Sequence, residues 1–168
     1  MKLVLPTLEH KALVEDFYDE IKNDINHIIG FGEFKNFNAW LADMQSRLTG
    51  HNLSESMVKE SYYLCFDRYK LIGVLSIKHE LNEYLFNYGG HIGYAVRQSE
   101  RNKGYATAIL ATGLKKAKEL NLSKLLIVCN KNNIASAKTI LNNGGILEDE
   151  ILDPYENVII QRYWINAM

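Results

Sequence analysis

The first 50 residues carry apolar side chains at helical spacing. Over residues 8–29 large apolar residues recur every three or four positions, which predicts an amphipathic helix that stops before Gly30 and Gly32. A second apolar face over residues 37–48 predicts another helix. The aromatic residues of this region invite two interpretations, a wall of a substrate pocket or ordinary core packing, and helical spacing favours the core. They are Phe31, Phe34, Phe37 and Trp40.

The pattern then changes to short runs rich in β-branched and aromatic residues. Residues 61–67 (SYYLCFD) and 71–79 (LIGVLSIKH) flank a short polar turn, which predicts an antiparallel hairpin. A loop over residues 81–90 leads to a third predicted strand at residues 92–97. This part of the chain is therefore expected to form antiparallel sheet.

Helical and strand-like segments alternate in the C-terminal half. The predicted elements are a helix at 104–120, a strand at 125–129, a helix at 134–141 and strands at 146–151 and 158–165. The run at 125–129 (LLIVC) is continuously apolar, as expected for a strand covered on both faces. The order of elements predicts an α/β (α+β) fold with a mixed sheet and one strand–helix–strand crossover. A length of 168 residues without a Pro-, Gly- or Ser-rich linker predicts one domain spanning residues 1–168.

Composition and charge exclude several classes of protein. With 19 basic and 20 acidic residues the formal charge is −1, so the positive excess typical of nucleic-acid-binding proteins is missing. No apolar run approaches the ~20 residues that span a bilayer, and the N-terminus does not resemble a secretory signal. Cys65 and Cys129 lie far apart and the five histidines are scattered, which predicts neither a disulfide nor a metal site. We therefore expect a cytoplasmic protein that contacts neither nucleic acid nor membrane and holds no metal.

The candidate chemistry lies where the crossover helix begins. A predicted strand ends near Val96, a polar turn follows, and the helix starts after the basic, glycine-containing segment Arg101-Asn102-Lys103-Gly104. Free backbone N–H groups at a helix start bind anions, and a glycine lets a phosphate approach the backbone closely. The segment therefore reads as a pyrophosphate site, with a helix start bearing solvated basic residues as the alternative. GxxxxGK[ST] and GxGxxG motifs are absent, which excludes a P-loop and a dinucleotide fingerprint.

The segment Arg101-Asn102-Lys103-Gly104-Tyr105-Ala106 resembles the R/Q-x-x-G-x-G/A signature of the GNAT acyltransferase superfamily. The similarity extends over roughly residues 60–165. It includes the strand at Gly90 to Val96 and the later strand–loop–helix at Leu125 to Asn133, followed by Ala135, Ser136 and Gly144. The resemblance implies a mixed, mostly antiparallel sheet of about six to seven strands flanked by four helices, in which the fourth and fifth strands splay apart. Acetyl-CoA is then the expected co-substrate, and its pantetheine arm would pair with the splayed strands as an added strand does.

The resemblance also implies the residues that bind the coenzyme. Backbone groups of Val96, Arg97 and Gln98 would meet pantetheine, and residues Arg101 to Ala106 would bind the pyrophosphate. Asn133 would hydrogen-bond pantetheine or help to order its loop. The alternative for Asn133 is a plain helix N-cap. The implied coenzyme-binding residues are Ala95, Val96, Arg97, Gln98, Arg101, Asn102, Lys103, Gly104, Tyr105, Ala106, Thr107, Asn133 and Ser136.

Acyl transfer to an amine needs a group that removes a proton from the nucleophile, because an amine with a pKa of ~10.4 is protonated at neutral pH. The catalytic candidates are His91, just before the strand that would run beside the thioester, and Glu83 in the preceding loop; His79 and Glu80 are further candidates. His91 could equally be bonded within the sheet, and the loop residues could simply be solvated. A strand N–H near Tyr94 to Val96 would polarise the thioester carbonyl.

At the position of the proton donor to the leaving thiolate, this sequence departs from the family's common pattern. Many family members use a tyrosine seven residues after the asparagine, and here that position is Ile140. Tyr94, Tyr155 or Tyr163 could replace it, or the thiolate could leave unassisted. Cys129 lies in an apolar strand and is interpreted as a core residue, not as a nucleophile.

The expected activity is transfer of an acetyl group from acetyl-CoA to an unidentified primary amine. The alternative is a non-catalytic acyl-CoA-binding regulatory module. It is retained because Ile140 occupies the position of the proton-donating tyrosine. The predicted protein is a monomer or a homodimer.

Overall fold

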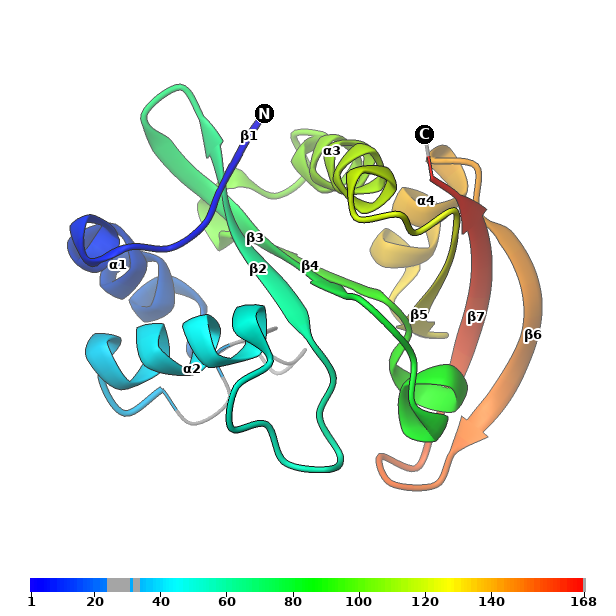
Figure 1. The fold of residues 1–168 in the computed structure, drawn as a ribbon. Coiled ribbons are helices and arrows are strands. Elements are labelled where there is room, and N and C mark those ends of the chain that lie inside the picture. The colour runs from blue at the N-terminus through cyan, green and yellow to red at the C-terminus, as the bar shows by residue number, and fades with distance from the viewer. Residues whose placement is uncertain (24–30, 32–33, 168) are drawn as a thin grey trace.

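The computed structural model describes residues 1–23, 31 and 34–167. The described residues form four α-helices and seven strands in two antiparallel sheets, one of four strands and one of three (Figure 1). This is the predicted mixed α/β architecture. The elements are β1 (Lys2–Val4), α1 (Lys11–Ile21), α2 (Phe37–Thr49), β2 (Glu60–Asp67), β3 (Lys70–Lys78), β4 (Ile92–Val96), α3 (Tyr105–Glu119), β5 (Lys124–Asn130), α4 (Ile134–Asn142), β6 (Ile146–Asp153) and β7 (Val158–Asn166).

Most boundaries lie within two residues of the prediction, and three features differ. Strand β1 was not predicted; it pairs antiparallel with β2 in the register Lys2↔Phe66. The first predicted helix is shorter than expected, because α1 ends at Ile21 and the next two residues form a turn; the rest of that prediction, with Gly30 and Gly32, lies outside the described residues. The loop before β4 contains a π-helical segment at Leu85–Gly89.

Helices cover both faces of the four-stranded sheet (Figure 1). Alternate residues of a strand point to opposite faces, and the core follows this rule: Leu64 packs in the cluster formed with α1 and α2, whereas Cys65 packs in the cluster formed with α3, α4 and the second sheet. Two covered faces explain why β2 is almost continuously buried. The aromatic residues Phe31, Phe37 and Trp40 are buried in the first cluster, which confirms their core role.

The two sheets meet at the start of β4 and then separate. The order is β1-β2-β3-β4 in one sheet and β5-β7-β6 in the other, so β4 and β5 are the facing edges. His91, just before β4, donates its backbone N–H to the carbonyl of Leu126 at 2.7 Å. Beyond that junction β4 pairs with β3 and β5 with β7. The predicted divergence of the fourth and fifth strands is confirmed, with β1 counted as the first strand.

Candidate active site

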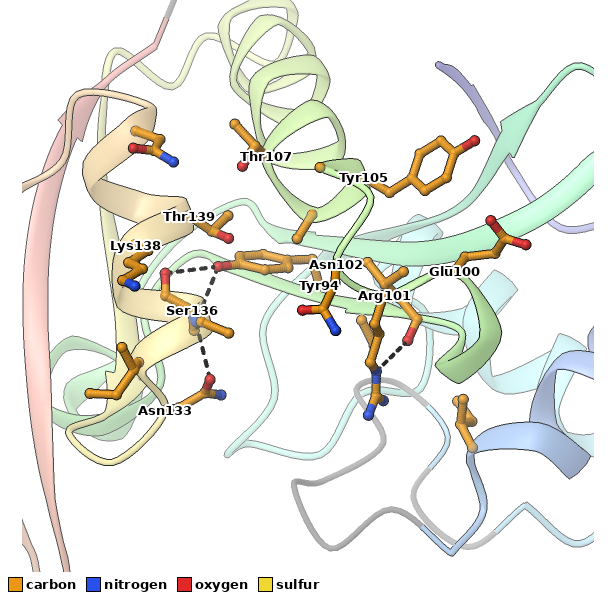
Figure 2. A pocket seen from close by; sticks show the side chains of 18 residues that line it. Tyr94, Glu100, Arg101, Asn102, Tyr105, Thr107, Asn133, Ser136, Lys138 and Thr139 are labelled. Atoms are coloured by element: carbon orange, nitrogen blue, oxygen red, sulfur yellow. Dashed lines mark hydrogen bonds between the residues drawn. The ribbon is translucent and has the colours of Figure 1, made fainter.

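A cavity of about 840 Å³ opens beside the end of β4. Its wall comes from the end of β4, the loop before α3, the first turn of α3 and one side of α4 (Figure 2), together with Ile21 at the end of α1. The lining residues are Ile21, Tyr94, Ala95, Val96, Glu100, Arg101, Asn102, Gly104, Tyr105, Ala106, Thr107, Asn133, Ile134, Ala135, Ser136, Lys138, Thr139 and Asn142. Segments from four separate elements therefore converge on one space, and ten of the thirteen predicted coenzyme-binding residues are among them.

The loop before α3 has the geometry of an anion site. Asn102 and Gly104 adopt left-handed conformations with φ of 62° and 80°, which turn the chain sharply into the helix. The helical hydrogen bonds of α3 begin with the Ala108 N–H, donated to the Gly104 carbonyl at 3.2 Å. The N–H groups before it precede the helical ladder and lie at the positive end of the helix dipole. This end of α3 is suited to a phosphate group.

Space as well as charge favours a ligand at Gly104. Among the described residues, no atom lies within 4 Å of the position that a Cβ would take there. Arg101 adds a guanidinium beside the loop, oriented by a bond from its Nε to the Val96 carbonyl at 3.2 Å (Figure 2). Glu100 also lines the cavity, but its carboxylate is paired with the ammonium groups of Lys70 and Lys103, and these hydrogen bonds lower its pKa. Its charge is thus largely compensated.

Strand β4 has one backbone edge on the cavity side, where the Val96 carbonyl accepts from Arg101 Nε. The Arg97 N–H bonds to the Ile72 carbonyl of β3, and the His91 carbonyl accepts from Lys78 on the same side. Because alternate residues direct their backbone groups to opposite edges, Tyr94 and Val96 direct theirs toward β5. An extended ligand that lies between the strands can pair with this edge.

The start of α4 forms the opposite wall. Asn133 caps the helix, because its side chain accepts from the Ser136 N–H at 3.1 Å. The Ser136 hydroxyl is 2.8 Å from the Tyr94 hydroxyl, which reaches across from β4 (Figure 2). The predicted N-cap is confirmed, and the same asparagine also faces the cavity.

Three predicted coenzyme-binding residues lie outside the cavity lining. The guanidinium of Arg97 is buried and pairs with Asp16 at 2.9 Å and Glu20 at 3.2 Å, which joins α1 to the end of β4. Lys103 donates to Glu100 and to the Ser99 carbonyl. The remaining residue is Gln98, exposed in a short 3-10 turn. The side chains of Arg97 and Lys103 therefore pair with other protein groups and do not line the cavity.

His91 holds the two sheets together. Besides its backbone bond to Leu126, its ring Nδ1 accepts the Leu126 N–H at 2.9 Å, and the residue is buried. Burial lowers the pKa of this histidine, and the charge of Lys78 lowers it further. The predicted role as general base stays a prediction, now restricted to Nε2 because Nδ1 is occupied.

Glu83, the second catalytic candidate, is exposed. Like His91, it lies outside the cavity lining. His79 bonds to Ser61 at 2.8 Å, and Cys129 is a buried free thiol, which confirms its core placement.

The prediction missed most of the α4 wall. Ile134, Lys138 and Asn142 follow one another at four-residue intervals, as do Ala135 and Thr139, so all five lie on one side of the helix. The helical spacing in the sequence indicated this side of the helix, because Ala137 and Ile140 mark the face that packs against the core. Lys138 adds a second cationic side chain to the cavity.

A diverging strand pair and a cavity lined by the N–H groups at a helix start suit a coenzyme-A-binding acyltransferase. The chain belongs to the GNAT acetyltransferase family, since residues 3–146 match the family model for the acetyltransferase (GNAT) domain. It is thus an acyl-CoA-dependent N-acetyltransferase with acetyl-CoA as co-substrate. A search of curated proteins found no match.

Solved structures share the fold at low sequence identity. A microcin C7 self-immunity acetyltransferase, in complex with acetyl-CoA and AMP, has a TM-score of 0.74 at 16% identity over 98% of this chain and 91% of its own. A ribosomal-protein-S5-alanine acetyltransferase from Vibrio fischeri has a TM-score of 0.74 at 17% identity, over 98% and 92% of the chains. A spermidine N-acetyltransferase from Vibrio cholerae has a TM-score of 0.65 at 14% identity, over 99% and 95%.

In the part of the chain that the structure describes, no helix is both long and apolar enough to cross a bilayer. Nor does that part of the chain group three or more His, Cys, Asp or Glu side chains where a metal ion could bind.

Proposed function

We propose that this protein transfers the acetyl group of acetyl-CoA to a primary amine by direct attack of the amine nitrogen on the thioester. The observation that carries the proposal is the cavity bounded by the end of β4, the start of α3 and one side of α4. A donor held in that cavity leaves its thioester open to a second substrate. The names of two structural neighbours point to amines, an alanine of a ribosomal protein and spermidine.

Within this proposal the cavity divides into a phosphate end and a thioester end. The N–H groups from Asn102 to Thr107 bind the pyrophosphate, with Arg101 and Lys138 supplying positive charge. Backbone groups of Tyr94 and Val96 pair with pantetheine and polarise the thioester carbonyl, and the loop at Asn133 guides the arm toward β4. Each part uses groups that the cavity already presents.

The amine must lose a proton before or during attack. His91 and Glu83 remain the proposed proton acceptors, with His91 acting through Nε2 or a water molecule. The proposed setting is cytoplasmic, with residues 1–168 acting as one domain in a monomer or a homodimer. Both cysteines are free thiols, in keeping with a reducing compartment.

An acceptor screen tests the proposal. Purified protein is mixed with acetyl-CoA and a panel of polyamines, amino acids, aminoglycosides and peptides, each beside its hydroxyl analogue, while free thiol is monitored. We expect thiol release with amines alone and N-acetylated products by mass spectrometry. Below the amine pKa, kcat/KM should rise about tenfold per pH unit as the neutral amine increases. Tight acetyl-CoA binding without amine-dependent thiol release, or acetylation of oxygen instead, would overturn the proposal.

A further inference from the structure

Tyr94 brings a hydroxyl group to the cavity from an unexpected element. It lies in the middle of β4, its ring is half-buried, and its hydroxyl is 2.8 Å from the Ser136 hydroxyl and 3.4 Å from the Ser136 carbonyl. Figure 2 shows the ring extending across the cavity to the first turn of α4. Burial raises the pKa of Tyr94 to about 12, so the phenol stays protonated at neutral pH.

Other candidates for the same task are placed elsewhere. Ile140 is fully buried in the core and cannot donate a hydrogen bond through its side chain. Tyr155 is 72% exposed on the β6–β7 turn, where it packs against Tyr84. Tyr163 is 2% exposed and donates to Gln161 at 2.7 Å. Of the three tyrosines that the sequence offered, Tyr94 is therefore the one that lines the cavity.

A second lining tyrosine is already engaged at the other end. The Tyr105 hydroxyl donates to the Asp67 carboxylate at 2.8 Å, beside the start of α3 where the phosphate end lies. The Tyr94 hydroxyl instead reaches Ser136 in the first turn of α4. In the proposed division of the cavity, Tyr94 is thus the phenol at the thioester end.

We propose that the Tyr94 hydroxyl donates a hydrogen bond to the coenzyme A sulfur as the thioester breaks, while the Ser136 hydroxyl donates to the Tyr94 oxygen and holds it in place. The inference rests on the proposed acetyl transfer. The amine nitrogen forms the new C–N bond, the C–S bond breaks, and its electron pair stays on sulfur. Tyr94 stabilises that developing negative charge, and the proton lost by the amine leaves through the base or water.

A hydrogen bond, not a completed proton transfer, follows from the acidities. The leaving thiol has a pKa of ~8.5 if it behaves like cysteine, whereas that of Tyr94 is raised to about 12. Moving the proton from oxygen to sulfur is thus unfavourable by about three to four pKa units. The phenol remains neutral throughout, so its titration should be missing from the pH–rate profile at working pH.

The direct test measures the acidity of bound coenzyme A, which needs no acceptor. The thiolate absorbs in the ultraviolet, so the pKa of the bound thiol can be titrated in the wild type, Tyr94→Phe, Ser136→Ala and Tyr163→Phe. We expect Tyr94→Phe to raise the pKa of the bound thiol by about one unit, and Ser136→Ala to raise it less. Tyr163→Phe removes a hydroxyl outside the cavity lining and should match the wild type.

Kinetics with an amine from the screen give the second readout. Tyr94→Phe should lower kcat by about 10- to 100-fold with little change in the Kd of acetyl-CoA and no change in the shape of the pH profile. An unchanged pKa of bound coenzyme A in Tyr94→Phe would overturn the inference, even if kcat fell, because it would leave only a structural role. A raised thiol pKa in a protein that acetylates no amine would support the hydrogen bond and overturn the proposed acceptor class.

Discussion

Replacing Gly104 by glutamate should weaken acetyl-CoA binding by about 100-fold or more. The new carboxylate would lie in the open space at the start of α3, where the pyrophosphate is proposed to bind. At ~4 Å and an effective dielectric constant of ~20, two like charges repel by about 4 kcal/mol, roughly a thousand-fold in affinity. Screening by solvent and salt at this exposed position reduces the effect to about 100-fold. Calorimetric titration with acetyl-CoA measures it.

Gly144 provides a matched control for this variant. It has the same left-handed conformation, with φ of 85° against 80° for Gly104, and within the described residues a Cβ at Gly144 likewise meets no atom within 4 Å. Gly144→Glu thus carries a similar backbone cost of about 1–2 kcal/mol and the same charge, but outside the cavity lining. It should bind acetyl-CoA normally. In Gly104→Asn the asparagine tolerates the left-handed conformation and adds no charge. This variant should therefore lose much less affinity for acetyl-CoA than Gly104→Glu.

If Gly104→Glu and Gly144→Glu bound acetyl-CoA equally well, the proposed pyrophosphate site would be wrong. Equal loss in both variants would point to general charge repulsion or partial unfolding, and would count against the site as well.

The loop and helix start at Arg101 to Gly104 were predictable because their cause is local. Four consecutive residues supply the turn, the glycine and the basic charge, and the helix they begin supplies the N–H groups. Most element boundaries were predictable for the same reason, since periodicity is a property of neighbouring residues. Strand β1 is the exception: it is three residues long, and its pairing with β2 supplies the hydrogen bonds that three residues cannot supply alone.

Residues whose partners lie far away in the sequence were beyond this reasoning. Arg97 was predicted to offer backbone groups to the coenzyme; its N–H bonds to the Ile72 carbonyl of β3, and its side chain pairs with carboxylates about 80 residues earlier, on α1. His91 contacts Leu126, 35 residues later. A histidine before a strand is compatible with catalysis and with structural bonding alike, and only the tertiary contact shows that one ring nitrogen is occupied.

The second prediction with a large expected effect is a loss of stability when His91 is replaced. We expect His91→Leu to lower the free energy of unfolding by about 1–3 kcal/mol, because the Leu126 N–H would then be buried without its acceptor. Gly90 leaves little room for local adjustment, since a Cβ there would lie 2.7 Å from the Leu126 carbonyl oxygen. Urea denaturation at neutral pH measures the loss. Unchanged stability would show that the side-chain bond contributes nothing to the junction of the sheets.

His91→Asn separates the hydrogen bond from the titration of the ring. The asparagine Oδ1 can take the place of Nδ1 as acceptor, so this variant should recover much of the stability lost in His91→Leu. Its pH dependence should also differ from that of the wild type. The pKa of His91 is lower in the folded protein than its ordinary value of 6.5, so below that value the unfolded chain binds more protons.

The stability contributed by neutral His91 is therefore fully present above pH 6.5 and is lost as the pH falls from 6.5 toward the lower folded value. Wild type and His91→Asn should lose stability at different rates between pH about 7.5 and about 5.5, with the smaller loss in the variant. The pKa of His79 is also lowered, mainly by burial, and that histidine remains in both proteins, so its effect cancels in the comparison. Parallel curves over this range would mean that the His91 ring titrates equally in the folded and unfolded chains, and the buried, acceptor-only role of Nδ1 would then be wrong.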